Sequence, residues 1–531
     1  MALESTVTVA GVSKRKAQGA HYTPPALVSA LVTEALRGWK PSSPSWRLLD
    51  PACGSGNFLV AAAREIAQRV QEPMQAFLST RVFGVDIDPV AVKLARSALL
   101  GLLPPRVSKA TREKVAVALR KHLIVHDALV PTLDAQLGDA KFDLILGNPP
   151  FLNQLEKGTA ASRERARVIA DATDGAVRRY ADLAAAFLLT NLSRLTRGGR
   201  LAFVMPQSFL STGDARAARD AALAQANLCA IWSCNESLFE AASVRVCTLV
   251  LSPRRPRTLR RAFGASFEPL ASSTSAPKIG DESWSNVLAE AFGAPIGRAV
   301  HQTPQRTIGG IAYATADFRD QYYGLAGFIR EGGAPRLVTT GHIDLAHCNY
   351  GTRAVRALGV RYEEPSVDRV GLAKASKVMS AWMTTRLVPK ILVATQTKVI
   401  EAWVDARGEV LPLVPLLIVT PREGVDVWQL AAALASPIVA ARAVAHYAGS
   451  ALSSTAIKLS AKQLLLMPLP SHEAAWLESA QHFKRASQES AAAARHAALS
   501  AFALASCHAH RLNATERRAM LEFWNRRVER R

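Results

Sequence analysis

The sequence predicts an α/β protein in which a doubly wound sheet of about seven strands is followed by an α+β domain and a helical tail. Three observations predict this class. Short apolar runs alternate with helical patterns up to residue 252. A Gly-rich turn follows the first run, as in the first βα unit of nucleotide-binding sheets. Several runs end in an acidic residue, at the edge where the carboxyl ends of parallel strands meet.

The composition is that of an ordinary globular protein with excess positive charge. Of 531 residues, 49% are hydrophobic, and 65 Lys and Arg face 43 Asp and Glu, giving a formal charge of +22. A chain of this length predicts two to four domains. The basic excess favours a polyanionic partner, most simply nucleic acid. An Arg-rich enzyme from a GC-rich genome would show the same excess without such a partner.

The sequence has no run of about 18 apolar residues and no signal-peptide pattern, so we expect a cytoplasmic protein without a membrane partner. Six scattered cysteines without a C-x-x-C pair predict free thiols. The cluster Cys507-His508-Ala509-His510 has ligand-type side chains, but its spacing matches known metal sites poorly. Side chains on an Ala-rich helix are the better interpretation, and we expect no metal.

Five segments follow from the composition along the chain. We expect a basic arm over residues 1–18, the α/β domain over 19–252, a basic, Pro- and Ser-rich linker over 253–300, the α+β domain over 301–470 and the helical tail over 471–531.

The first strand and its turn predict a ligand site. A helix is expected after Thr23, whose hydroxyl would be the N-cap before two prolines. The strand Leu48–Asp50 then leads through Gly54 and Gly56 to a helix that begins near Asn57. Glycines let the backbone approach a ligand and expose N–H groups at a helix N-terminus. The third glycine of G-x-G-x-x-G is missing, which favours a nucleoside such as S-adenosylmethionine over a dinucleotide.

Two further strands end in acids. Residues 82–86 form a strand that ends in Asp86, whose carboxylate can accept from both hydroxyls of a ribose. A helix N-cap is the alternative role for this residue taken alone. Residues 122–129 predict a third strand ending at Asp127, a carboxylate suited to an adenine amino group.

The fourth strand, residues 142–147, leads into Asn148-Pro149-Pro150-Phe151. Two prolines fix φ and remove two backbone donors, so this loop offers acceptors. The Asn148 side-chain oxygen and the Pro149 carbonyl can accept from one amino group, and Phe151 offers a flat apolar face. The loop therefore predicts a site that holds a planar ring with an exocyclic NH2.

The remaining elements are less specific. Residues 200–205, 228–233 and 244–251 predict three more strands, the last two paired as a hairpin. The loop between them carries Phe239, and an exposed Phe there is usually satellite core packing. A basic stretch follows that is either a solvated connector or a phosphate-contacting track, with Arg254, Arg255, Arg257, Arg260 and Arg261. Further strands (336–343, 389–394, 399–404 and 410–419) and a helix over 428–446 are expected downstream.

Taken in order, Asp50-Pro51-Ala52-Cys53-Gly54-Ser55-Gly56-Asn57-Phe58 and Asn148-Pro149-Pro150-Phe151 resemble the gamma class of N6-adenine DNA methyltransferases of type II restriction–modification systems. In that class Tyr-Thr-Pro precedes the Gly-rich loop and a target-recognition domain lies C-terminal. The resemblance covers about residues 19–470 and is firmest over the first 250. It implies a Rossmann-like S-adenosylmethionine-dependent methyltransferase domain, with target recognition over 301–470.

The resemblance also implies residue roles. Asn148, Pro149, Pro150 and Phe151 would hold the target adenine, and Phe239 would stack on its far face. Phe151 departs from the Tyr of many relatives, but stacking needs only the ring. The residues implied to contact the cofactor are Tyr22, Thr23, Asp50, Ala52, Gly54, Gly56, Asn57, Asp86, Ile87, Asp127, Ala128 and Asn148.

The implied activity is site-specific methyl transfer to N6 of a flipped adenine in duplex DNA, EC 2.1.1.72, in restriction–modification or phage defence. The implied setting is the bacterial or archaeal nucleoid, with a restriction endonuclease or other defence subunit as a candidate partner, and we expect no nuclease ahead of residue 19. Two alternatives stay open. An RNA or protein-glutamine methyltransferase can use the same loop, and the chain could be a non-catalytic DNA-binding subunit of a defence complex.

Overall fold

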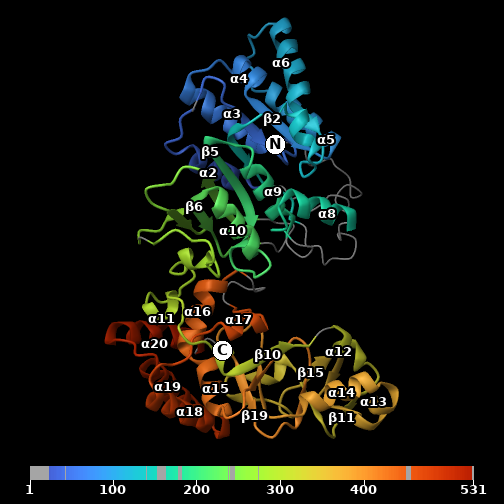
Figure 1. Ribbon diagram of the computed structural model, residues 1–531, viewed down its shortest axis with the longest axis vertical. Helices are drawn as coiled ribbons and strands as arrows, with labels where there is room; N and C mark the ends of the chain where they lie inside the picture. Colours follow the sequence, from blue (N-terminus) through green and yellow to red (C-terminus); the bar gives the residue numbers. More distant parts are fainter. Residues whose placement is uncertain are drawn as a thin grey trace. The chain divides into compact units, whose positions relative to one another are not determined.

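The computed structural model describes residues 23–41, 43–138, 140–151, 163–177, 182–236, 238, 245–272, 274–317, 319–449 and 456–528. The chain divides into two compact units, Met1–Leu288 (unit 1) and Ala289–Arg531 (unit 2), each with its own strands and helices (Figure 1). The expected N-terminal arm over residues 1–18 lies outside the described residues.

Unit 1 contains a nine-stranded sheet with the strand order β3-β2-β1-β4-β5-β7-β6-β8-β9. Strands β1 to β5 run parallel, β7 is antiparallel to β5 and β6, β8 is parallel to β6, and β9 is antiparallel to β8. The central strands are buried, as parallel strands covered on both faces should be. Their bounds are β1 Leu48–Asp50, β2 Val82–Asp86, β3 Leu123–Val125, β4 Phe142–Gly147, β5 Leu195–Pro206, β6 Asn227–Ser233, β7 Val246–Ser252, β8 Arg260–Phe263 and β9 Glu268–Pro269.

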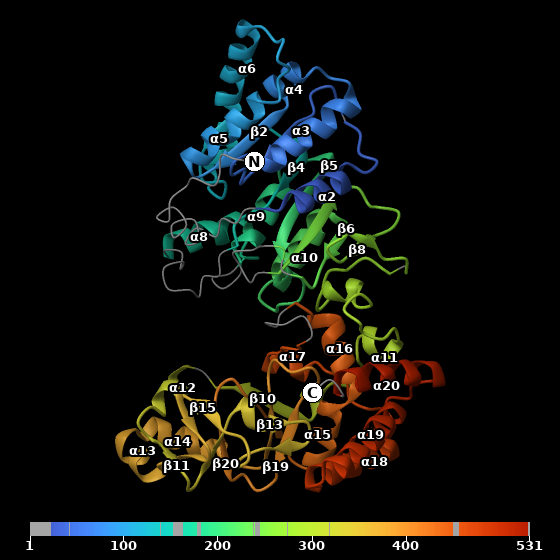
Figure 2. The same ribbon diagram turned by 180° about the vertical axis from the view of Figure 1, so that it is seen from behind.

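From β1 to β6 the helices of unit 1 alternate with the strands along the chain, as in a doubly wound fold (Figure 2). They are α2 Pro25–Leu36, α3 Asn57–Val70, α4 Met74–Thr80, α5 Pro89–Leu100, α6 Lys109–His122, α7 Thr132–Gln136, α8 Arg163–Ala172, α9 Leu183–Leu192, η1 Gln207–Leu210, α10 Arg216–Gln225 and η2 Ser285–Leu288. Helix α9 is buried along its whole length because all but two of its side chains are apolar.

The strand predictions for unit 1 are confirmed in position, and three expectations for this unit need correction: the end of β3, the cap of α2 and the linker after residue 252. Strands β2 and β4 have the expected bounds, and β6 and β7 pair as the expected antiparallel neighbours. Strand β3 ends at Val125 and not at Asp127, because the Asp127 carboxylate accepts from the Leu129 N–H and turns the chain.

The second correction concerns helix α2. Pro24 is its N-cap residue, without a side-chain hydrogen bond, so Thr23 does not have the expected capping role. The Thr23 hydroxyl contacts another residue, described below.

The third correction is that residues 253–300 are not a linker throughout. Strand β8 extends the sheet beside β6, so the sheet has nine strands where about seven were expected. Farther on, Trp284 is fully buried and packs edge-on against Phe209 at 5.7 Å. Burial of one large aromatic side chain contributes on the order of 2–3 kcal/mol, enough to dock a segment that looked like a solvated connector.

Unit 2 contains two four-stranded sheets and two ribbons of two strands each. The first sheet is antiparallel, with β10 Ala312–Ala316, β21 Leu417–Pro421, β18 Lys390–Val393 and β19 Ala402–Asp405 in that order. The second has β11 Ile329–Glu331, β17 Pro365–Val367, β12 Arg336–Val338 and β20 Val410–Pro412, with β12 and β20 parallel. The ribbons pair β13 Ile343–Asp344 with β14 His347–Cys348, and β15 Val355–Ala357 with β16 Val360–Tyr362.

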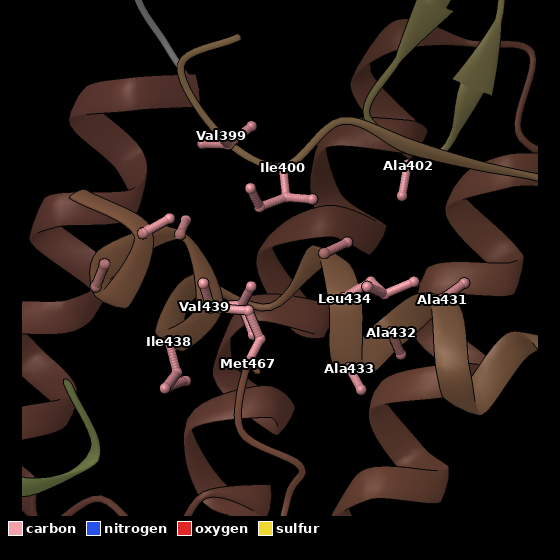
Figure 3. Close-up of a cluster of buried hydrophobic side chains, with 14 of the residues drawn as sticks. Val399, Ile400, Ala402, Ala431, Ala432, Ala433, Leu434, Ile438, Val439 and Met467 are labelled. Carbon is pink, nitrogen blue, oxygen red and sulfur yellow. The ribbon is translucent and has the colours of Figure 1, made fainter. Parts of the chain in front are cut away.

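Helices α11 and α15 to α20 share a large hydrophobic core with the first sheet, whereas α13 and α14 pack in a second cluster with strands of the second sheet. Side chains from the strand β19 region, from helices α15 and α16 and from Met467 meet in the large core (Figure 3). The helices are α11 Arg298–His301, α12 Arg319–Gly324, α13 Arg369–Ala375, α14 Lys377–Arg386, α15 Val427–Ala435, α16 Pro437–Tyr447, α17 Ala461–Leu465, α18 Glu473–Gln488, α19 Ala492–Ala509 and α20 Ala514–Val528, with short 3-10 turns at Ile308–Gly310 and Thr340–His342.

Two expectations for unit 2 need correction. The single helix over residues 428–446 is two helices, because Pro437 starts α16 and the Ser436 hydroxyl caps it by accepting from the Val439 N–H at 3.3 Å. The segment after residue 470 is not a separate tail, since Trp476, Phe502 and Trp524 lie in the same core as α15 and α16.

No single helix in the described part of the chain is long and apolar enough to cross a membrane, and α15 with α16 reaches that length only as a pair bent by 48°. All six cysteines are free, as expected. Among the described residues no three His, Cys, Asp or Glu side chains group as metal ligands, and Cys507 is buried in the helical core.

Candidate functional site at the carboxyl edge of the unit 1 sheet

The candidate site lies where the strand order of the unit 1 sheet reverses. Strand β1 sits between β2 and β4, and all three run parallel, so the loops that follow them emerge at one edge. In doubly wound sheets this point is where ligands bind. The sequence predicted one site from the Gly-rich turn, Asp86 and Asn148. These three features lie at the ends of the adjacent strands β1, β2 and β4.

Carboxylates at the strand ends hold the Gly-rich turn by accepting backbone hydrogen bonds. The Asp50 Oδ1 accepts from the Ala52 N–H at 3.0 Å, and the Asp86 Oδ2 accepts from the Gly54 N–H at 2.8 Å. The Asp86 Oδ1 accepts from the Asp88 N–H at 2.9 Å. Asp88, and not Asp86, is the N-cap of α5, which removes the capping interpretation of Asp86. The two expected cofactor acids therefore hold the Gly-rich turn to the ends of β1 and β2.

Both glycines of the turn adopt the left-handed backbone. Gly54 has φ +51° and Gly56 has φ +89°, the latter as the N-cap residue of α3. A Cβ on Gly56 would lie 3.1 Å from the Cα and Cβ of Ala95 in α5. The turn thus needs glycine both for its conformation and for close packing of α3 on α5.

Burial raises the pKa values of the two acids at this edge of the sheet, Asp50 and Asp86. The side chain of Asp50 is almost fully buried, and burial raises its pKa to about 8, with the nearby Asp86 charge raising it further and the Ala52 N–H opposing. Burial also raises the pKa of Asp86. A Cβ on Gly147, the last residue of β4, would lie 2.7 Å from the Asp50 Oδ1, so the strand keeps glycine where the carboxyl group sits. Raised acid pKa values in a strand-end site are typical of functional positions.

Asn148 follows Gly147 and has a fixed amide. Its Nδ2 donates to the Thr23 Oγ1 at 2.9 Å, and this donor assignment leaves Oδ1 as the acceptor. The Oδ1 atom is buried and has no hydrogen-bond partner among the described residues. Pro149 and Phe151 beside it are also buried. A buried acceptor without a partner costs about 1–3 kcal/mol, so the edge holds a polar group that a ligand donor would satisfy.

The expected adenine-side residues are placed differently from the acids above. The Asp127 Oδ2 forms an ion pair with Arg165 of α8 at 3.1 Å, and its Oδ1 accepts from the Leu129 N–H. Ala128 is buried, whereas Ile87, directly after Asp86, is 56% exposed. Ile87 therefore offers an apolar face at this edge, while Asp127 is engaged by its own loop and by α8.

The structure corrects part of the expected basic track. Arg261 is buried in β8 and donates to the Val287 carbonyl and the Ser272 hydroxyl, each at 2.7 Å, so its guanidinium is engaged inside unit 1 and is not exposed to an external phosphate. Arg260 pairs with Glu34, a carboxylate that it shares with Arg37. These two arginines bind partners within unit 1 because β8 is a strand of the sheet and not part of a solvated linker. Arg254, Arg255 and Arg257 precede the strand and are exposed. Tyr22 and Phe239 lie outside the described residues.

Two polar residues at this edge, Asp182 and Gln207, were not predicted from the sequence as site residues. Asp182 caps α9 by accepting from the Ala184 N–H at 2.9 Å, and burial raises its pKa to about 7. Gln207 follows β5, is 1% exposed and donates from Nε2 to the Ser233 Oγ at the end of β6, at 2.9 Å. Asp before the apolar run at 183–192 was a readable N-cap signal. No local signal marks Gln207, because its partner is a distant strand.

Comparison with known proteins agrees with this geometry. Residues 4–263, just under half of the chain, match the family model described as N-6 DNA Methylase. The match ends with β8, which supports counting that strand with unit 1.

Two curated relatives are type II methyltransferases. M.VspI of Vibrio sp. (strain 343) is 28% identical over 175 residues, 33% of this chain and 35% of that protein. M.CvrRI of Paramecium bursaria Chlorella virus XZ-6E is 22% identical over 246 residues, 46% of this chain and 51% of that protein. The chain therefore spans about half or less of the length of these relatives.

Two solved structures share the fold. The Type IIL restriction-modification enzyme MmeI in complex with DNA is similar over 99% of this chain and 81% of its own, with a TM-score of 0.64 at 14% identity. A nuclease-deletion mutant of the Type ISP restriction-modification enzyme LlaGI is similar over 88% of this chain and 55% of its own, with a TM-score of 0.52 at 11% identity. At these identities the likeness concerns the fold, and it confirms the expected fold class. The expected resemblance to DNA adenine methyltransferases of restriction–modification systems is likewise confirmed, because residues 4–263 match the N-6 DNA Methylase family model and the two curated relatives are type II methyltransferases.

Proposed function

We propose that the chain is a site-specific DNA methyltransferase that methylates N6 of an adenine flipped out of duplex DNA, in restriction–modification or phage defence. One observation carries this proposal. The Asn148 Oδ1 is a buried acceptor without a partner among the described residues, held in place by Thr23 beside the Gly-rich turn. Such an acceptor takes an N–H or O–H donor, and the exocyclic amino group of adenine is one.

The residues at the strand ends fit S-adenosylmethionine, which would supply a methyl group on a positively charged sulfonium. Gly54 and Gly56 carry no side chain, so a ligand can approach the backbone of the turn closely. Each Asp86 oxygen accepts one backbone N–H and keeps capacity for a ribose hydroxyl. The exposed Ile87 offers an apolar face for a base. The Asp50 carboxyl, whose pKa burial raises, would ionise beside a cation.

Asn148 and Pro149 would activate the target nitrogen. The lone pair of adenine N6 is delocalised into the ring, which makes N6 a poor nucleophile. Hydrogen bonds from N6–H to the Asn148 Oδ1 and the Pro149 carbonyl favour a more tetrahedral nitrogen and so localise that pair. Because Thr23 fixes the amide before the base arrives, the acceptor needs no reorganisation during transfer. Phe151 would stack on the base.

Duplex DNA is the favoured substrate over RNA or protein. The formal charge of +22 and the exposed Arg254, Arg255 and Arg257 suit a polyanion. Unit 2 adds two sheets and a helical core beyond the methylase match, and MmeI, similar over 99% of this chain, was solved with DNA. Extruding the base costs roughly a few kcal/mol, which contacts from both units would offset.

A substrate competition tests the proposal. Full-length chain and radiolabelled S-adenosylmethionine are incubated with plasmid DNA, ribosomal RNA and a protein release factor together, and the label in each is counted. We expect label in DNA alone, and sequencing of the DNA should place it on adenines in one short motif. Label in RNA or in protein would overturn the DNA assignment. No label in any substrate, with DNA bound, would favour the non-catalytic subunit.

A further inference from the structure

Strands β15 and β16 form an isolated ribbon whose turn is sharply defined. Val355 pairs with Tyr362, Arg356 with Arg361 and Ala357 with Val360, and the ribbon joins neither four-stranded sheet. The connecting residues Leu358 and Gly359 both have positive φ, +49° and +84°. This is the turn geometry that matches the twist of a two-residue hairpin. The label β15 marks the ribbon beside α12 in both views (Figures 1 and 2).

One face of the ribbon carries two directly opposed arginines. Arg356 and Arg361 are cross-strand partners, and both side chains are exposed. Cβ atoms of directly opposed residues are roughly 4.5–5.5 Å apart, and like charges at that spacing destabilise a strand pair. This pairing therefore costs stability, and a bound ligand of opposite charge would relieve that cost.

Nearby carboxylates relieve the repulsion only in part. Arg361 contacts the Glu363 carboxylate at 3.2 Å, but the two side chains are 71% and 66% exposed, and ion pairs that exposed are weak. Among the described residues no carboxylate pairs with Arg356. Most of the positive charge on this face thus remains available to an external anion.

The other face and the base of the ribbon are held firmly. Ala357 is 1% exposed and belongs to a buried cluster with Leu337 and Leu411. Before the ribbon, Arg353 donates to the Gly341 carbonyl at 3.0 Å and pairs with Asp344 at 3.1 Å. The backbone positions of the opposed arginines are therefore held, and the ribbon presents two positive charges from one face.

From this geometry we propose that the β15–β16 ribbon enters a groove of duplex DNA, where Arg356 and Arg361 bind backbone phosphates. The inference rests on the proposed function, because it names the element of unit 2 that contacts the same substrate. The major groove admits a two-stranded ribbon, and guanidinium forks bind phosphate oxygens in pairs. Contact with phosphates releases condensed counterions, so the arginines add affinity that falls with salt.

The test measures DNA affinity of the full chain across a salt series. Fluorescence anisotropy with a labelled duplex compares the wild type, Arg356→Ala/Arg361→Ala and a double Lys variant at the same positions. The control is Arg407→Ala/Arg518→Ala, which removes the same charge from two positions that are 83% and 84% exposed. We expect the ribbon variant to bind at least about tenfold more weakly and the slope of log K against log salt to fall by about 1.8, for two lost phosphate contacts.

The control should stay within about twofold of the wild type, and the Lys variant should keep the slope, because lysine also binds phosphate as a point charge. Equal affinity and slope in the ribbon variant and the control would overturn the inference. A changed methylated motif with an unchanged slope would overturn the phosphate contact in favour of base readout.

Methyl transfer separates this inference from the proposed function. At saturating DNA the ribbon variant should retain its turnover within about twofold and show only a raised KM for DNA, because no residue of the unit 1 site is altered. If the wild type neither binds nor methylates DNA, the proposed function fails. If the wild type methylates DNA and the ribbon variant has an unchanged KM, only the ribbon inference fails.

Discussion

The Thr23 hydroxyl accepts a hydrogen bond from the Asn148 Nδ2 at 2.9 Å, across 125 positions of the chain. Thr23 precedes α2, whose own first turn it does not cap. The residue therefore acts on the Asn148 amide, and it does so from a side chain that is 6% exposed. This contact decides which amide atom is left to accept from a ligand, and the first two predictions follow from it.

Asn148→Ala should bind DNA and S-adenosylmethionine but transfer methyl groups at least about a hundredfold more slowly, because a preorganised acceptor is lost. Single-turnover methylation with labelled cofactor measures the rate, and titration of each ligand measures binding. Asn525→Ala, at an exposed position of α20, is the control. Near-normal turnover in Asn148→Ala would contradict the assignment of Asn148 to the methyl-transfer site.

Thr23→Val should slow methyl transfer about tenfold or more while the affinity for DNA stays unchanged, because the amide of Asn148 loses its anchor and samples other orientations. Thr23→Ser keeps a hydroxyl and should recover most of the rate. Turnover at saturating DNA distinguishes the two variants. Equal rates in the Val and Ser variants would show that the hydroxyl is not what positions Asn148.

Gly147→Ala should destabilise unit 1 by about 1–3 kcal/mol, because its Cβ would lie 2.7 Å from the Asp50 Oδ1. Cofactor binding should weaken as well, since Asp50 holds the Gly-rich turn through Ala52. Thermal unfolding and cofactor titration measure the two effects. The matched control is Gly213→Ala, where nothing lies within 4 Å of the added atom and which should unfold like the wild type.

Asp50 should make the stability of the cofactor-free protein fall as pH rises. Burial raises its pKa from 3.8 to about 8, so the folded state binds a proton that the unfolded state has lost throughout that interval. The free energy of unfolding therefore decreases between about pH 4 and pH 8 and levels off above. Relative to Asp50→Asn, the Tm of the wild type should drop across this interval. A constant difference in Tm would mean that Asp50 is charged in the folded protein.

Breaking the buried ion pair Lys390–Asp405 in unit 2 should lower the free energy of unfolding far more than breaking an exposed ion pair. Both side chains are buried, and the Asp405 carboxylate also accepts from the Val410 N–H at 3.2 Å. Asp405→Ala leaves an uncompensated buried ammonium and should cost about 3–5 kcal/mol of unfolding free energy in urea. Glu522→Ala, which breaks the exposed pair with Arg518, should cost less than about 1 kcal/mol. Similar costs would contradict the burial argument.

Much of unit 1 could be predicted from the sequence, because its signals are local. Apolar runs gave the bounds of β2 and β4, which are the bounds observed. The glycines before Asn57 marked the turn and the start of α3. Two prolines after Asn148 marked a loop rich in acceptors. Hydrophobic runs, glycine freedom and proline restriction act within a few residues and need no partner far along the chain.

Only the tertiary structure decided which partner each polar side chain found. Thr23 contacts Asn148 and not the first turn of α2, Asp127 pairs with Arg165, and β8 joins the sheet and buries Arg261. Each outcome depends on burial and on the meeting of segments tens of residues apart. A buried donor or acceptor must find a partner, but the sequence around it does not say which one the fold will bring.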